Sequence, residues 1–249
     1  EKYVIGIILG LGGEPLYPYV SAAPTTAMAG VIDPDYFLYY CKDHPDWPTG
    51  GWHAGSWAAA MALEVMNAIE EGETRLIPVL EEGLTAMLAH RNPVTGLWGA
   101  DGADLGRAIG GALKVLHRFH YYLGMEGLPG TERMADTVIE NIDFWFCRGS
   151  RTNDCYPRNA VEMMAVCLES SEYRRDDLFV AMDDMAGRYV CMADAPDTRT
   201  HEYGLGILSG YLHWRDCEIF NPKAWCHRGA AYGRRLVVRP DGRVKAELK

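Results

Sequence analysis

Apolar residues recur every three to four positions along most of the chain, from Trp52 to about Arg215. This spacing puts them on one face of an α-helix, whereas a half-buried strand shows alternation with a period of two. Short breaks that contain glycine, proline or acidic residues separate the periodic segments. The pattern predicts helices over 52–71, 74–90, 104–123, 131–147, 158–171, 174–193 and 202–215.

Residues typical of helix ends stand at several of these breaks. Gly72 and Gly124 suit C-terminal caps, because glycine readily adopts the left-handed conformation found there. Asp33 followed by Pro34 is typical of an N-cap with proline at the first helical position. Thr131 begins a polar first turn. These capping residues support the predicted helix ends.

Strand-like alternation appears only near the C-terminus, in the segment RRLVVRPDGRVKAEL. A Pro-Asp-Gly turn between two short apolar runs predicts a β-hairpin. We therefore expect an all-α domain over 1–219, with an irregular segment over 1–50 and helical hairpins over 51–219. A C-terminal extension over 220–249 is expected to contain the β-hairpin.

Four stretches rich in small residues recur at intervals of about fifty residues. They begin GSWAAAM at Gly55, GRAIGGA at Gly106, RNAVEMM at Arg158 and YGLGILS at Tyr203. A more amphipathic helix lies between the first and second of these stretches, and another lies between the second and third. A helix crowded on several sides needs small residues, whereas a peripheral helix needs only one apolar stripe. The alternation predicts an inner ring of Gly/Ala-rich helices and an outer ring of amphipathic ones.

The connections from outer to inner helices are long, polar and aromatic, as in TGLWGADGADLGRA, while the returning connections are short. In a ring of hairpins the long connections fall on one face, around the N-termini of the inner helices. Those termini suit an anionic or polyhydroxyl ligand. This face is expected to form the mouth of a funnel. It collects Trp52, His53, Trp98, Asp101, Asp104, Arg107, Asn153, Asp154, Tyr156, Arg158, Asn159, His201, Glu202 and Tyr203.

The hairpin period and the loop NPVTGLWG resemble the α/α-toroid superfamily. That superfamily includes terpenoid cyclases, protein prenyltransferase subunits, and toroidal polysaccharide lyases and glycoside hydrolases. The resemblance covers roughly residues 50–215 and implies a helical-hairpin array forming a partial or complete α/α toroid. The chain lacks the D-x-D-D motif of the protonating cyclases and the Q-W repeats of the squalene cyclase branch, which disfavours cyclase chemistry.

Composition argues against several classes of partner and site. The chain has 24 Lys and Arg against 34 Asp and Glu, a formal charge of −10, and such a surface repels nucleic acid and anionic membranes. The longest apolar run, YVIGIILGLGG, is shorter than the roughly 18–20 residues of a membrane span. The seven cysteines include no C-x-x-C pair, so a zinc ribbon is not expected. Cys167 and Cys191 lie in helical apolar patterns and are expected in the core.

The resemblance to toroidal polysaccharide lyases implies one set of catalytic roles. In those enzymes Asn and Arg neutralise a uronate carboxylate, His or Tyr removes the adjacent proton, and Tyr often protonates the leaving oxygen. By that pattern Arg158 and Asn159 form the clamp and His201 is the base. Tyr203 or Tyr156 is the acid. The alternative is that Arg158 and Asn159 only cap a helix and His201 is a surface loop residue.

Acidic residues on the same face permit a second chemistry. Glycoside hydrolysis needs two carboxylates flanking the scissile bond, and the candidates are Asp101, Asp104, Asp154 and Glu202. Asp101 and Asp104 equally suit the N-terminal end of a helix, where the dipole favours negative charge. Both interpretations stay open.

Trp52 and Trp98 occupy corresponding positions, each shortly before an inner helix. An exposed indole stacks on sugar rings, but tryptophan is also a common loop anchor packed into a core, and the sequence favours neither. The other substrate-binding candidates are His53, Asp104, Arg107 and Asn153.

His117 and His120 share a helix face but have no evident third ligand, so no metal site and no cofactor are expected. The sequence favours a carbohydrate-active enzyme that cleaves an acidic poly- or oligosaccharide by β-elimination. The alternatives are a glycoside hydrolase with paired carboxylates, a non-catalytic helical array that binds a glycan or protein, and a terpenoid-handling toroid. Carbohydrate is the expected partner, with no nucleic acid and no membrane span.

Overall fold

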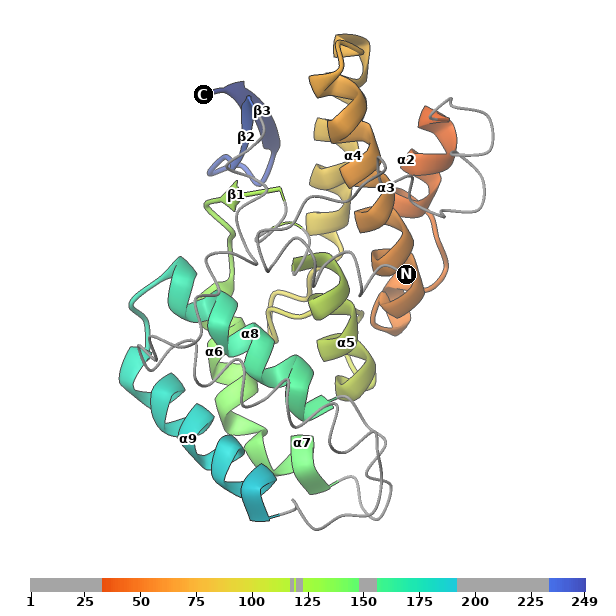
Figure 1. The fold of residues 1–249 in the computed structure, drawn as a ribbon. Helices are drawn as coiled ribbons and strands as arrows, with labels where there is room; N and C mark the ends of the chain where they lie inside the picture. The colour runs from red at the N-terminus through yellow and green to blue at the C-terminus, as the bar shows by residue number, and fades with distance from the viewer. Residues whose placement is uncertain (1–32, 117–118, 120–122, 148–155, 192–232) are drawn as a thin grey trace, which may run out of the picture.

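The computed structural model describes residues 33–116, 119, 123–147, 156–191 and 233–249, and most of these are helical (Figure 1). The helices are α2 (Pro34–Lys42), α3 (Trp52–Glu70), α4 (Ile77–Ala89), α5 (Leu105–Leu116), α6 (Thr131–Glu140), α7 (Ile142–Cys147), α8 (Tyr156–Ser170) and α9 (Arg175–Cys191). Short 3-10 turns cover Trp47–Thr49 and Thr74–Leu76. Strands β1 (Met125–Glu126), β2 (Arg234–Val238) and β3 (Val244–Leu248) form one sheet.

The helix boundaries follow the sequence signals closely. Asp33 caps α2 by accepting hydrogen bonds from the backbone N–H groups of Asp35 and Tyr36, which confirms the predicted N-cap. This helix lies inside the stretch 1–50 that was expected to be irregular. Gly72 follows the C-cap of α3 with a φ of +113°, as its assignment to a helix end requires.

The predicted helix 131–147 is wrong in one respect, because it divides into α6 and α7 at Asn141. Asn141 leaves helical geometry with φ −110° and ψ 25°. Its side-chain Nδ2 donates to the carbonyl of Thr137, 2.8 Å away. An asparagine side chain that bonds to a nearby backbone carbonyl competes with the regular hydrogen bonds of the helix. The apolar periodicity of segment 131–147 does not indicate this break. The predicted helix 202–215 lies outside the described residues.

Helix α5 occupies the middle of the helical body. It packs between α3 on one side and α8 on the other (Figure 1). Helices α2 and α4 pack against α3 and against each other, while α6, α7 and α9 pack against α8. Helices α3, α5 and α8, which contain the first three small-residue stretches, therefore lie in a row.

One continuous apolar core runs through these helices. Alanines of α3, including Ala54, Ala58 and Ala62, are fully buried and let neighbouring helices approach closely. Cys167 is buried in α8, as predicted, and burial raises the pKa of its thiol to about 12. Burial also raises the pKa of the Cys41 thiol well above its usual value. The side chain of Cys191 lies outside the described part of the chain.

The predicted β-hairpin is confirmed. Strands β2 and β3 pair antiparallel from Arg234 opposite Leu248 to Val238 opposite Val244. The sheet has an additional strand, β1, which pairs parallel to β2. With two residues, β1 is too short to show alternation in the sequence.

The hairpin packs on α4. The backbone N–H of Val244 donates to Thr85 Oγ1 at 2.9 Å, and that of Ala246 donates to Glu81 Oε1 at 2.9 Å. Leu236 is fully buried in the shared core. In Figure 1 the hairpin, drawn in blue, accordingly lies beside β1 and α4.

Within the described ranges, no helix combines the length and the apolar character that a membrane crossing requires.

Candidate functional site

The connection between α4 and α5 lines a cavity of about 300 Å³. This volume lies at the lower end of the range typical of small-molecule sites. The first turn of α5 completes the wall. The lining residues are Asn92, Val94, Thr95, Trp98, Gly99, Ala100, Asp101, Gly102, Ala103, Leu105 and Ala108.

Asn92 fixes the start of this connection. Its side-chain Oδ1 accepts hydrogen bonds from the backbone N–H groups of Val94 at 2.8 Å and Thr95 at 3.2 Å. Its backbone carbonyl accepts from the N–H of Gly96, and its own N–H donates to the carbonyl of Leu97. Only 7% of Asn92 is exposed. These bonds hold the turn in a single conformation.

Trp98 is a buried anchor of the same connection. It is fully buried, and its indole N–H donates to the carbonyl of Met87 at 2.8 Å. The guanidinium of Arg91 lies over the ring, 5.1 Å from the centroid. That guanidinium also donates to the carbonyl of Gly96 and, through a short contact, to the carbonyl of Pro129. Of the two roles open to Trp98 in the sequence, the structure favours the anchor, although the residue is also among those that line the cavity.

Asp101 contributes a carboxylate to the cavity wall. Its Oδ1 accepts a hydrogen bond from Nδ2 of Asn92 at 2.8 Å, and the residue as a whole is exposed. Asp104 has a different task, because its Oδ1 accepts from the backbone N–H of Arg107 at the start of α5, at 2.9 Å. The geometry at Asp104 is that of an N-cap.

A second polar cluster joins the N-termini of α3 and α5 around Asp46. Asp46 Oδ2 accepts from the backbone N–H groups of His53 at 2.6 Å and Ala54 at 3.1 Å. Its Oδ1 accepts from Arg107 at 2.8 Å and from Thr49 Oγ1 at 3.1 Å. Arg107 is therefore bound within the protein, and His53 contributes its backbone N–H to the cluster.

The charge on Asp46 is stabilised by these partners. Burial alone would raise the pKa of its carboxyl. The hydrogen bonds from Ala54, His53 and Thr49 and the charge of Arg107 outweigh burial, so the pKa lies below its usual value. The N-cap position of α3 is Gly51, so Asp46 satisfies the first N–H groups of α3 from outside the helix, and its bond to Arg107 ties α5 to α3.

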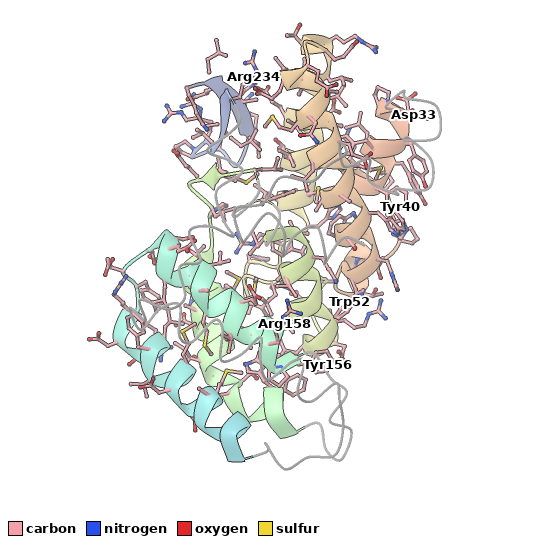
Figure 2. The ribbon with its side chains drawn as sticks, in the orientation of Figure 1. Asp33, Tyr40, Trp52, Tyr156, Arg158 and Arg234 are labelled. Carbon is pink, nitrogen blue, oxygen red and sulfur yellow. The ribbon has the colours of Figure 1, made fainter. Side chains whose placement is uncertain are left out.

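The glycines of α5 explain why this helix has so few side chains near its start. The ring of Tyr156 covers Gly106, where an added Cβ would lie 2.5 Å from Tyr156 Cζ. The ring of Trp52 covers Gly110 even more closely. Figure 2 shows Trp52, Tyr156 and Arg158 arranged around this part of α5. Small residues here admit aromatic rings from both neighbouring helices.

The predicted site residues lie on two sides of α5, one side facing the cavity and the other facing the rings of Trp52 and Tyr156. Leu105 and Ala108 line the cavity, whereas Gly106 and Gly110 receive the rings of Tyr156 and Trp52. Residues 105 and 108 lie on a different helix face from residues 106 and 110, because successive residues are about 100° apart. Trp98 and Asp101 thus belong to the cavity, and Trp52 and Tyr156 do not line it.

The two residues assigned to a uronate clamp lie in the first turn of α8. Asn159 is 1% exposed, which hides it from a polymer at the surface. Arg158 is partly buried, and its Nε lies 3.7 Å from Oε1 of Glu162 one turn later. Five further candidates lie outside the described residues, namely Asn153, Asp154, His201, Glu202 and Tyr203.

Sequence reasoning missed Asp46 and Asn92, although a repeated pattern marks both. The segments DWPTGGW from Asp46 and NPVTGLW from Asn92 share the spacing Asx-x-x-Thr-Gly-x-Trp. Gly50 and Gly96 both have positive φ, at +120° and +70°. In each segment the Asx side chain accepts backbone hydrogen bonds ahead of a helix, α3 after Asp46 and α5 after Asn92.

In the described portion of the chain, no three or more His, Cys, Asp or Glu side chains are grouped so as to hold a metal ion. His117 and His120 lie outside that portion. Comparison of the chain with protein-family models, with curated proteins and with solved structures finds no match.

Proposed function

We propose that this chain binds a carbohydrate in the cavity formed by the α4–α5 connection. The observation that supports this most directly is the exposed carboxylate of Asp101, oriented by the buried amide of Asn92 within a largely apolar wall. Small-molecule sites typically combine such a wall with a few fixed polar groups. A sugar ring offers the matching surfaces, because its C–H faces are apolar and its hydroxyls donate to a carboxylate.

Binding has more support in the geometry than either kind of cleavage. Paired-carboxylate hydrolysis needs a second acid beside Asp101; among the described candidates Asp104 is occupied as the N-cap of α5, and Asp154 and Glu202 lie outside the described residues. For β-elimination, the clamp residue Asn159 is buried within α8. The proposal therefore concerns recognition of the sugar, and cleavage enters as an outcome to be tested.

We also infer an α/α-toroid arrangement for the helices. In this proposal α3, α5 and α8 form the inner layer, and α2, α4, α6, α7 and α9 form the outer layer. The order of helix contacts supports it, since α5 packs between α3 and α8 while α2 packs with α4 and α6 with α9. The small residues on α3 and α5 also support it, because inner helices are crowded on several sides.

Asp101→Asn is expected to weaken carbohydrate binding at least about tenfold while leaving thermal stability nearly unchanged. A hydrogen bond to a charged group contributes roughly 1.5–3 kcal/mol, and 1.4 kcal/mol corresponds to tenfold in affinity. The asparagine oxygen can still accept from Asn92, so the loop should keep its structure. The measurement is isothermal titration calorimetry with a panel of neutral methyl hexosides and hexose oligosaccharides.

Asp35→Asn is the matched control, because Asp35 is an exposed carboxylate on α2 away from the cavity. It should leave affinity unchanged. If no member of the panel binds, or if both variants bind as tightly as the wild type, the cavity is not the carbohydrate site. Assays for reducing ends and for the ultraviolet absorbance of unsaturated uronates, on the same panel and on polyuronates, show whether the bound sugar is also cleaved by hydrolysis or elimination.

A further inference from the structure

The charges around the cavity suit an uncharged ligand better than an acidic one. The lining includes Asp101, and none of the described lining residues is lysine, arginine or histidine. Two nearby guanidinium groups are already bound elsewhere. Arg91 donates to the carbonyl of Gly96 beside the Trp98 ring, and Arg107 donates to Asp46. An acidic sugar in this cavity would meet the like charge of Asp101, with no cation among the described lining residues to compensate it.

The orientation of the Asn92 amide is determined by its partners. Its Oδ1 faces two backbone N–H groups, those of Val94 and Thr95, so Nδ2 is the atom that faces Asp101. Of the two carboxylate oxygens, Oδ1 accepts the hydrogen bond from this amide. Among the described residues, no donor forms a hydrogen bond with Oδ2 of Asp101. This second oxygen remains available to a ligand hydroxyl.

We propose that the cavity selects uncharged hexose rings over hexuronates, with Asp101 as the specificity-determining residue and Asn92 as the residue that positions it. This selectivity rests on the proposed carbohydrate binding at the same site. Asp101 accepts a hydroxyl hydrogen bond from the neutral sugar and repels the carboxylate of the uronate. Asn92 holds Asp101 in the orientation that makes the distinction.

The test is titration of the full chain with matched methyl glycosides that differ only at C6, in the gluco, galacto and manno series. Where the neutral hexoside binds, the wild type is expected to prefer it over the hexuronide by at least about tenfold. Asp101→Asn should lower the affinity for the hexoside and bring the ratio close to one, since it removes both the acceptor and the charge.

Asn92→Ser tests positioning separately. Serine retains an oxygen for the turn but has no amide to reach Asp101. The hexoside-to-hexuronide ratio should fall at temperatures where the variant is fully folded. Asn141→Ser is the matched control, because it removes a 2.8 Å side-chain hydrogen bond at the α6–α7 break and should leave the ratio unchanged.

The failures of the two proposals are distinguishable. Equal or tighter binding of the hexuronide by the wild type, or a ratio that Asp101→Asn does not alter, overturns the selectivity and leaves carbohydrate binding in place. An equal fall in the ratio for Asn92→Ser and Asn141→Ser overturns the positioning role. Absence of binding by both members of every pair overturns the carbohydrate site and the selectivity together.

Discussion

Replacing Gly111 with alanine is expected to lower the free energy of unfolding by about 3 kcal/mol or more. A Cβ on Gly111 would lie far inside van der Waals contact with the carbonyl oxygen of Gly50. This neighbour is backbone, held by the turn that leads into α3, so it cannot move aside as a side-chain tip can. Helix α5 would have to separate from α3, opening the part of the core that they share.

Gly187→Ala provides the control for this prediction. Gly187 lies in α9, and an added Cβ would meet nothing within 4 Å. Because alanine has the higher helix propensity, this variant should be more stable than the wild type by roughly 0.5–1 kcal/mol. Chemical denaturation of both variants measures the contrast. A Gly111→Ala protein as stable as Gly187→Ala would mean that α3 and α5 do not approach as described.

Asp46→Ala is expected to lower the free energy of unfolding by about 2–4 kcal/mol, because the variant loses a charged acceptor of several hydrogen bonds at the N-terminus of α3. Asp46 is only 9% exposed. Its removal leaves the first N–H groups of α3 without their acceptor and releases Arg107 from the start of α5. Denaturation midpoints at neutral pH give the magnitude.

Arg107→Ala separates the ion pair from the bonds to the backbone N–H groups of α3. The side chain of Arg107 is 45% exposed, so solvent screens its charge and the ion pair itself should contribute at most about 1 kcal/mol. Arg107→Ala should therefore be much less destabilising than Asp46→Ala. Equal losses for the two variants would show that the ion pair, and not the bonds to the backbone N–H groups of α3, is the main contribution of Asp46.

The same carboxylate predicts a pH dependence of stability. The pKa of Asp46 in the folded protein lies below the ordinary value of 3.8, so the unfolded chain binds this proton more readily. The stability contributed by Asp46 should be complete above about pH 4–5 and should be lost as pH falls below 3.8 through the folded pKa. The stability difference between wild type and Asp46→Ala should accordingly shrink in acid. A difference that is constant from pH 6 to pH 2.5 would contradict the role of the charged acceptor.

Helix positions were predictable because they depend on local spacing. Apolar periodicity and the capping residues Asp33 and Gly72 are properties of short segments, and helices α3, α4, α8 and α9 begin and end within a few residues of the predicted bounds. The exceptions are α2, in a stretch expected to be irregular, and the predicted helix 131–147, which divides in two. The glycine-rich character of α5 correctly indicated a crowded helix. Which groups crowd it, the rings of Trp52 and Tyr156, depends on contacts between distant segments, so the sequence alone could not identify them.

The candidate site was less predictable, because burial and pairing decide what a polar residue does. Arg107 and Asp104 are residue types that often bind ligands, but both are hydrogen-bonded within the protein. Asn92 resembles an ordinary turn residue before proline, yet it holds the Asp101 carboxylate. Burial separates Trp98 from Trp52, since their positions in the Asx-x-x-Thr-Gly-x-Trp pattern are the same.

The most direct test of carbohydrate binding at the cavity is ¹⁹F NMR of protein labelled with 5-fluorotryptophan, titrated with a neutral methyl hexoside. Trp98 lines the cavity, whereas Trp145 is buried in α7 with its indole N–H bonded to Val138. Trp98→Phe and Trp145→Phe variants assign the two resonances. Binding in the cavity predicts a saturable shift of the Trp98 resonance, absent in Asp101→Asn, with the Trp145 resonance unchanged. Saturable binding that leaves the Trp98 resonance unmoved would contradict the assignment of the ligand to this cavity.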